Sequence, residues 1–165
     1  MTTYRFGSHA HLPPTEALFL WADLDRVTEW MEGVTRVSDA VGRPDLPDFA
    51  LPGHSTPLVT APGSRYTLWF GRRPVRYQVV AQEEPRADTA HRTRLDGSFR
   101  RGETLVTFEP EGDGCRITLV VHADGLLPRI VARLLALGSY RGSYRSQLSS
   151  FGRLADREHW RGLII

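Results

Sequence analysis

The chain has 165 residues, which is enough for one domain with its own core and too few for two domains of usual size. Its composition is that of a globular protein, with 41% hydrophobic and 24% charged residues, and its single cysteine, Cys115, excludes an internal disulfide. The formal net charge is +2, and all 21 basic residues are arginine. Schiff-base chemistry and P-loop phosphate binding are therefore excluded, because both require a lysine.

The first quarter of the chain predicts a strand, two short helices and a second strand. Residues 4–12 alternate between two sets of side chains, which is typical of a half-buried strand. Pro13 and Pro14 end this strand and open a helix over 16–22, and a second helix follows Asp25 and stops at Gly33. Alternation resumes over 34–41, which predicts the second strand.

A proline-rich segment comes next. Residues 42–63 contain five prolines and show neither a helical nor a strand period. A long segment of this kind inside a compact domain is often a binding loop or a lid. We therefore expect a loop or lid at 42–63.

The second half of the chain predicts more strands and then one helix. The expected strands are 65–71, 75–82, 89–95, 103–109 and 115–123. Two strong turn signals, Asp96-Gly97 and Gly112-Asp113-Gly114, end the third and fourth of these. After Gly125 the apolar residues recur at spacings of three and four, which predicts a long C-terminal helix.

This order of elements predicts an α+β domain. A curved antiparallel β-sheet grips the long C-terminal helix, and two short helices lie between the first two strands. Such an arrangement leaves a concave, mostly apolar space between sheet and helix, which is where ligand sites are commonly found.

Three stretches resemble the START/Bet v 1-like helix-grip superfamily, in its polyketide cyclase/dehydrase and lipid transport (SRPBCC) branch. Residues 14–34 are similar to the family's first helix pair, with the acid–arginine step before Val27 and a terminal Trp30. Residues 107–118 resemble the family's hairpin, with Cys115 where threonine is usual, and the helix after Gly125 is similar to the gripping helix. The resemblance implies a single helix-grip ligand-binding domain over 1–165, from whose family pattern the 42–63 segment departs.

The resemblance also implies that the partner is a hydrophobic or aromatic small molecule held in an internal cavity. Two functions stay open: a cofactor-independent polyketide cyclase/aromatase or dehydratase, and a non-catalytic lipid or small-molecule carrier. A protein-interaction module is a third, weaker alternative. No cofactor and no metal ion is expected.

A polyketide cyclisation or dehydration needs a proton acceptor, a proton donor and a group that stabilises an enolate. We assign the base to His91, because histidine titrates near neutral pH, and the donor to Tyr77 or Tyr66. Arg141 stays protonated, so it can only anchor or stabilise negative charge. His91 and Tyr77 become neighbours if His91 faces inward; the opposite strand facing would turn two arginines inward instead.

Ligand-binding residues are expected on the inward strand faces, at the end of the second short helix and on the long helix. Each of them also has an ordinary structural interpretation, as a core aromatic residue or a solvated side chain. Alternation turns Arg65 and Trp69 outward. The ligand-binding candidates are Trp30, Met31, Tyr66, Leu68, Phe70, Val79, Leu119, Leu137, Tyr140 and Tyr144.

The remaining patterns give expectations about partners and location. Residues 125–165 carry seven arginines against two acids, but the arginines are dispersed, so we expect a solvated helix face and no nucleic-acid partner. His9 and His11 share a face with Arg5, which favours an exposed strand face over a metal site. No apolar run is long enough for stable membrane insertion and no signal-peptide pattern is present, so a cytoplasmic location is expected.

Overall fold

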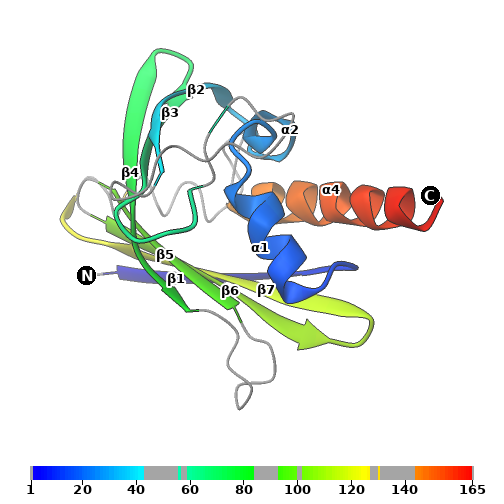
Figure 1. Ribbon diagram of the computed structural model, residues 1–165. Coiled ribbons are helices and arrows are strands. Elements are labelled where there is room, and N and C mark those ends of the chain that lie inside the picture. The colour runs from blue at the N-terminus through cyan, green and yellow to red at the C-terminus, as the bar shows by residue number, and fades with distance from the viewer. Residues whose placement is uncertain are drawn as a thin grey trace.

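The computed structural model describes residues 2–42, 56, 59–83, 93–99, 102–126, 130 and 144–164. Their strands form one antiparallel sheet in the order β1-β7-β6-β5-β4-β3-β2, so that β1 and β2 are its edges. Figure 1 shows that the sheet is strongly curved. The strands are β1 (Thr2–Ala10), β2 (Val34–Val41), β3 (Arg65–Phe70), β4 (Arg73–Glu83), β5 (Thr93–Phe99), β6 (Gly102–Glu111) and β7 (Gly114–Ala123).

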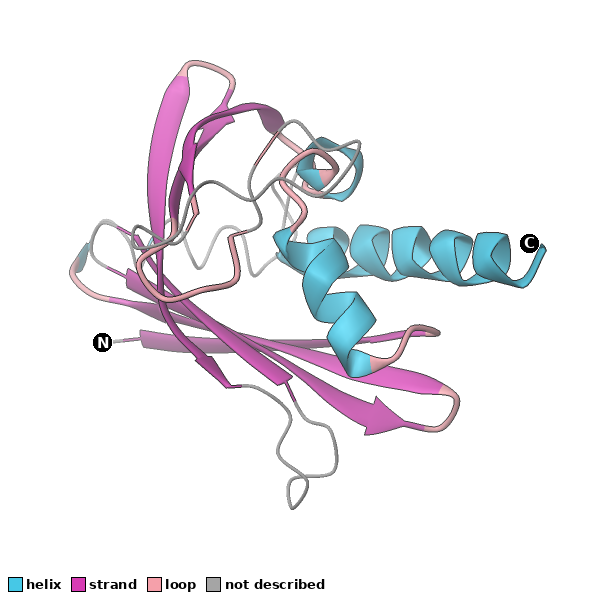
Figure 2. Ribbon diagram, in the orientation of Figure 1, coloured by secondary structure: helices cyan, strands magenta, loops and turns pink. Residues whose placement is uncertain are grey.

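The helices lie together on the concave side of the sheet (Figure 2). They are α1 (Pro14–Ala22), α2 (Val27–Trp30) and α4 (Tyr144–Ile164). α1 begins with Pro14 in its first turn, where the missing N–H of proline costs no hydrogen bond. α2 ends before Gly33, whose φ of 94° lets the chain turn into β2. The expected α+β helix-grip architecture is confirmed.

Strand alternation predicted the faces of β3 and β7 correctly. In β7 the side chains of Ile117, Leu119 and Val121 are buried, whereas Arg116 between the turn and Ile117 is exposed. Register continues this inner face across the sheet, because Leu119 pairs with Phe6 of β1 and with Val106 of β6. The inner face is therefore a continuous apolar surface beneath the helices.

One predicted turn is wrong. Asp96 and Gly97 were expected to end a strand, but both lie within β5, where they pair with Leu105 and Thr104 of β6. The strand instead runs to Phe99, which pairs with Gly102. A neighbouring strand on each side supplies hydrogen bonds to this backbone, and such pairing overrides a local turn preference.

The core is the contact between α4 and the inner face of the sheet. Phe151 of α4 is fully buried, and its ring lies 5.1 Å from that of Trp30 and 5.0 Å from that of Trp21, between centroids. Gly152 brings the helix close to β1, since a Cβ there would lie 3.0 Å from the carbonyl oxygen of His9. The two short helices and α4 thus share one aromatic core on the sheet.

Candidate functional site

Three tyrosines come together from two strands and a helix. Tyr66 of β3 and Tyr77 of β4 are paired directly in the register, and their rings stack with centroids 5.5 Å apart and planes at 12°. Tyr144 begins the described part of α4, and its ring lies 5.3 Å from that of Phe6 in β1. Both Tyr66 and Tyr144 interact electrostatically with Tyr77. The sequence predicted each residue separately, and the structure assembles them as a trio.

Burial raises the pKa values of these three hydroxyls, which are protonated at neutral pH even at the ordinary pKa of 10. It raises the pKa of Tyr66 and of Tyr144 to about 12, and that of Tyr77 further still. The other two tyrosines add to the rise in the pKa of Tyr77, because two phenolates near each other repel. A phenol with such a pKa is a hydrogen-bond donor or acid at neutral pH, and it cannot serve as a base.

The predicted apolar residues surround this trio in the core. Leu68, Val79 and Leu119 are buried on the inner faces of β3, β4 and β7. Phe70 and Met31 are partly buried and pack against the same cluster. These side chains are apolar and uncharged, and they belong to the same core cluster as the trio.

Trp30 carries an unsatisfied polar atom. Its side chain is only 2% exposed, and its ring is tilted by 38° against that of Trp21, with centroids 4.5 Å apart. Among the described residues, its Nε1 and the hydroxyl of Ser64 are the buried side-chain polar atoms without a hydrogen-bond partner. Leaving such a donor unpaired costs about 1–3 kcal/mol. An acceptor on a bound molecule would recover that cost.

Four of the predicted site residues lie outside the described residues. They are His91, Leu137, Tyr140 and Arg141. Just beyond His91, the register pairs Thr93 with Phe108 and Leu95 with Val106. These partners are buried residues of the inner face.

One end of the proline-rich segment is anchored to the short helices. The hydroxyl of Thr56 donates to Asp25 Oδ1 at 2.9 Å, and Val59 is buried beside Ala22 and Leu24. Farther along, the backbone N–H of Gly63 donates to the carbonyl oxygen of Val79 at 2.8 Å. Residues 43–55 and 57–58 of the expected lid lie outside the described residues.

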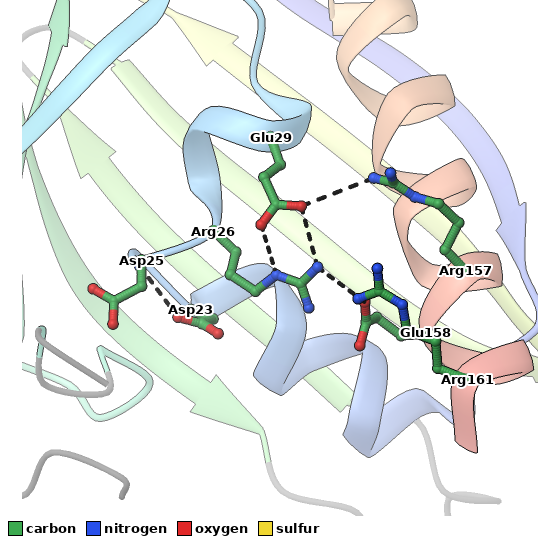
Figure 3. Close-up of polar contacts among 7 residues, drawn as sticks. All are labelled: Asp23, Asp25, Arg26, Glu29, Arg157, Glu158 and Arg161. Carbon is green, nitrogen blue, oxygen red and sulfur yellow. Dashed lines mark hydrogen bonds and ion pairs between the residues drawn. The ribbon is translucent and has the colours of Figure 1, made fainter. Parts of the chain in front are cut away.

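An ion-pair network joins α2 to α4, and we call it the Arg26 clamp (Figure 3). Arg26 donates from Nε and Nη2 to the two carboxylate oxygens of Glu29, at 2.9 and 3.1 Å. Its Nη2 also donates to Glu158 of α4 at 2.9 Å, and Glu158 accepts a further bond from Arg161. Arg157 lies 3.8 Å from Glu29. Sequence analysis missed the clamp; its one local signal was the three-residue spacing of Arg26 and Glu29.

We expect Arg26→Ala to lower the free energy of unfolding by about 1–2 kcal/mol, since hydrogen bonds to charged groups contribute about 1.5–3 kcal/mol and solvent screens part of this. The matched control is Arg153→Ala, because Arg153 bonds only to serines of its own helix in the described contacts.

Arg26 lowers the pKa of Glu29 and of Glu158 below the ordinary 4.5. The difference between wild type and Arg26→Ala in urea unfolding should therefore persist at neutral pH and shrink as pH falls below 4.5. A pH-independent difference would contradict the clamp.

His11 forms a second contact between the sheet and α4. Its backbone N–H and its Nδ1 both bond to Asp156 Oδ1, at 3.0 and 2.9 Å, and its Nε2 lies 3.9 Å from Asp113 in the β6–β7 turn. The sequence placed His11 on the first strand, but β1 ends at Ala10, which frees His11 to turn toward α4. Among the described residues, no three metal-ligating side chains form a cluster that could hold a metal ion.

The contact predicts a pH-dependent stability. The hydrogen bond that His11 donates to the Asp156 carboxylate raises the pKa of His11 above its ordinary 6.5. A group whose pKa is raised on folding stabilises the protein below its unfolded pKa, and the effect is lost as pH rises through the folded value. Wild type should therefore exceed His11→Gln in thermal stability most clearly below pH 6.5, with the gap narrowing toward alkaline pH. A gap that widens above neutral pH would contradict this assignment. His122→Gln is the matched control.

Cys115 is a buried free thiol at the start of β7. Burial, together with the charge of Glu111, raises the pKa of the Cys115 thiol to about 11, so it is a structural thiol rather than a nucleophile. In the portion of the chain that the structure covers, none of the helices has the length and apolar character needed to cross a bilayer.

Comparisons with known proteins agree with this architecture. The family model described as polyketide cyclase / dehydrase and lipid transport matches residues 2–156. Among solved structures, MLL2253 from Mesorhizobium loti is similar over 94% of this chain and 98% of its own, with 12% identity and a TM-score of 0.64. TTHA0849 from Thermus thermophilus is similar over 93% and 97%, with 19% identity and a TM-score of 0.56.

Ara h 8.0201 is also similar, over 93% of this chain and 97% of its own, with 12% identity and a TM-score of 0.57. At such identities the likeness supports the fold and does not carry function with it. No curated protein sequence matches the chain.

Proposed function

We propose that this chain, which belongs to the polyketide cyclase/dehydrase and lipid transport family, holds a hydrophobic small molecule between the inner face of its sheet and helix α4. Membership of that family supports the binding of a hydrophobic ligand. The observation that supports this most is the trio of Tyr66, Tyr77 and Tyr144, with raised pKa values, on an apolar wall. A flat, mostly apolar molecule with a few oxygen atoms could pack against this wall and accept hydrogen bonds from its hydroxyl groups.

We propose further that the ligand is polyketide-like and that the protein acts as a cyclase or dehydratase. His91 removes a proton from a carbon next to a carbonyl group. Tyr77 donates a hydrogen bond to the oxygen on which the enolate charge develops, and Arg141 stabilises that charge. Tyr77 is protonated at neutral pH, so its hydroxyl can act as a donor in this role. Trp30 offers a second donor through its unpaired Nε1.

A specific observation favours the carrier as the second candidate. Within the described residues, the polar groups of the trio are phenol hydroxyls, which can donate hydrogen bonds and cannot act as a base. Such groups alone hold a ligand without removing a proton from it. Binding without turnover therefore identifies a carrier, whereas turnover requires a base such as His91.

The test is turnover of a poly-β-ketone substrate by the purified protein, with Tyr77→Phe and His91→Ala as variants. For a cyclase we expect Tyr77→Phe to lower kcat about 100-fold, as removal of an oxyanion donor does, with little change in affinity. Tyr4→Phe is the matched control, because it also removes one phenol hydroxyl but lies in β1 outside the trio. Turnover that neither Tyr77→Phe nor His91→Ala changes would overturn the residue assignments.

A further inference from the structure

The part of the sheet formed by β2, β3 and β4 carries a dense positive charge. Residues 34–41 and 65–80 contain five arginines and one acid, Asp39, so five positive charges less one negative give +4, against +2 for the whole chain. None of the five appears in the ion pairs formed by the described residues. These exposed residues, which we call the arginine face, are Arg36, Arg65, Arg72, Arg73 and Arg76.

Strand alternation separates Arg36, Arg65 and Arg76 of the arginine face from the proposed ligand site. Tyr66 and Tyr77 point to the inner side, so their neighbours Arg65 and Arg76 point outward. Arg36 joins them from β2, where it pairs with Trp69. Arg72 lies in the β3–β4 turn, and Arg73 follows it as the first residue of β4, where its pairing with Phe70 places it on the inner side of the strand. The arginines are thus spread in two dimensions over three strands about 4.8 Å apart.

The details of this face favour a planar anionic surface over a nucleic-acid strand. A single strand of nucleic acid needs an open aromatic ring for base stacking. Trp69 does not offer one freely, because the guanidinium carbon of Arg36 lies 4.0 Å above its ring and its Nε1 donates to Ser38 at 2.9 Å. Val80, which is 49% exposed, adds an apolar contact at the far end of β4. Guanidinium groups bind phosphate oxygens in a bidentate manner, and phospholipid headgroups present these in a plane.

We propose that the arginine face docks the protein peripherally on a bilayer rich in anionic phospholipids. The docking itself does not depend on the proposed function. The additional idea that the bilayer supplies the hydrophobic ligand rests on the proposed function. Attraction to such a surface contributes about 1 kcal/mol for each arginine near it and is weakened by salt.

The test is co-sedimentation with vesicles of phosphatidylglycerol and phosphatidylcholine, against vesicles of phosphatidylcholine alone. Wild type should bind the mixed vesicles at low salt and release at high salt. The double variant Arg65→Gln/Arg76→Gln should bind about thirtyfold more weakly, as the loss of two surface arginines predicts. The control Arg5→Gln/Arg145→Gln has the same net charge and changes exposed arginines on β1 and on α4, so it should bind as wild type does.

Four results would overturn the docking proposal: no binding of wild type to the mixed vesicles, equal weakening in both double variants, wild-type binding by Arg65→Gln/Arg76→Gln, or binding of single-stranded DNA or an acidic protein in place of vesicles. Binding of a fluorescent hydrophobic probe in the absence of vesicles tests the proposed ligand binding separately from the proposed bilayer docking. The arginine variants should bind it as wild type does, whereas failure of wild type to bind it would contradict the proposed function and leave the vesicle result standing.

Discussion

Phe151→Ala is expected to lower the free energy of unfolding by about 3–5 kcal/mol, the usual cost of truncating a buried phenylalanine. Phe151 is fully buried, and its ring contacts those of Trp21, Trp30 and Phe108. It is therefore the side chain at which α4, both short helices and the sheet meet. Marginal stability of about 5–15 kcal/mol for the whole domain makes this loss a large share of the total.

The measurement is equilibrium unfolding in urea, followed by tryptophan fluorescence, because Trp21 and Trp30 both lie against Phe151. Ser149→Ala, on the exposed side of the same helix, is the control and should stay within about 0.5 kcal/mol of wild type. A loss below about 1 kcal/mol in Phe151→Ala would mean that α4 does not pack on the sheet as described.

Gly114→Ala is expected to destabilise the protein by about 1–3 kcal/mol or more, because it overpacks a close contact between strands. An added Cβ would lie 2.0 Å from the carbonyl oxygen of Ala10 and 2.8 Å from the Cα of His11. Both of these are backbone atoms, so the end of β1 would have to separate from the β6–β7 turn. The His11 contact to Asp156 begins at that same point and should weaken with it.

Thermal unfolding of Gly114→Ala and Gly162→Ala gives a matched comparison. Gly162 lies in α4 with no atom within 4 Å of an added Cβ, so the same change should stabilise the helix by about 0.5–1 kcal/mol. Opposite signs for the two substitutions are the expected result. Stabilisation by Gly114→Ala would show that the turn does not approach β1 so closely.

The sequence predicted those parts of the fold that depend on local periodicity. Residues such as Ile117 and Leu119 follow the alternation of a regular strand, and both are buried as expected. Asp96-Gly97 shows the limit of this reasoning, because their turn preference is local and the pairing that overrides it comes from β4 and β6.

The contacts between distant parts of the chain could not be predicted in the same way. Arg26 and Glu158 are 132 residues apart, and no local spacing or periodicity in the sequence predicts their contact. Tyr66 and Tyr77 were each assigned to an inward face, but their stacking depends on the register of the β3–β4 hairpin, which pairs them directly. The roles proposed for His91, Leu137, Tyr140 and Arg141 remain predictions from the sequence.

Native mass spectrometry of the purified protein tests the central claim most directly, since the claim is that a hydrophobic molecule binds between the sheet and α4. We expect an added mass that survives gentle ionisation and is released on denaturation, and whose fragments identify a hydrophobic small molecule. Protein that arrives without a bound ligand should take up a long-chain fatty acid or a polycyclic aromatic compound added before the measurement. The bare mass of the chain under all of these conditions would contradict the account.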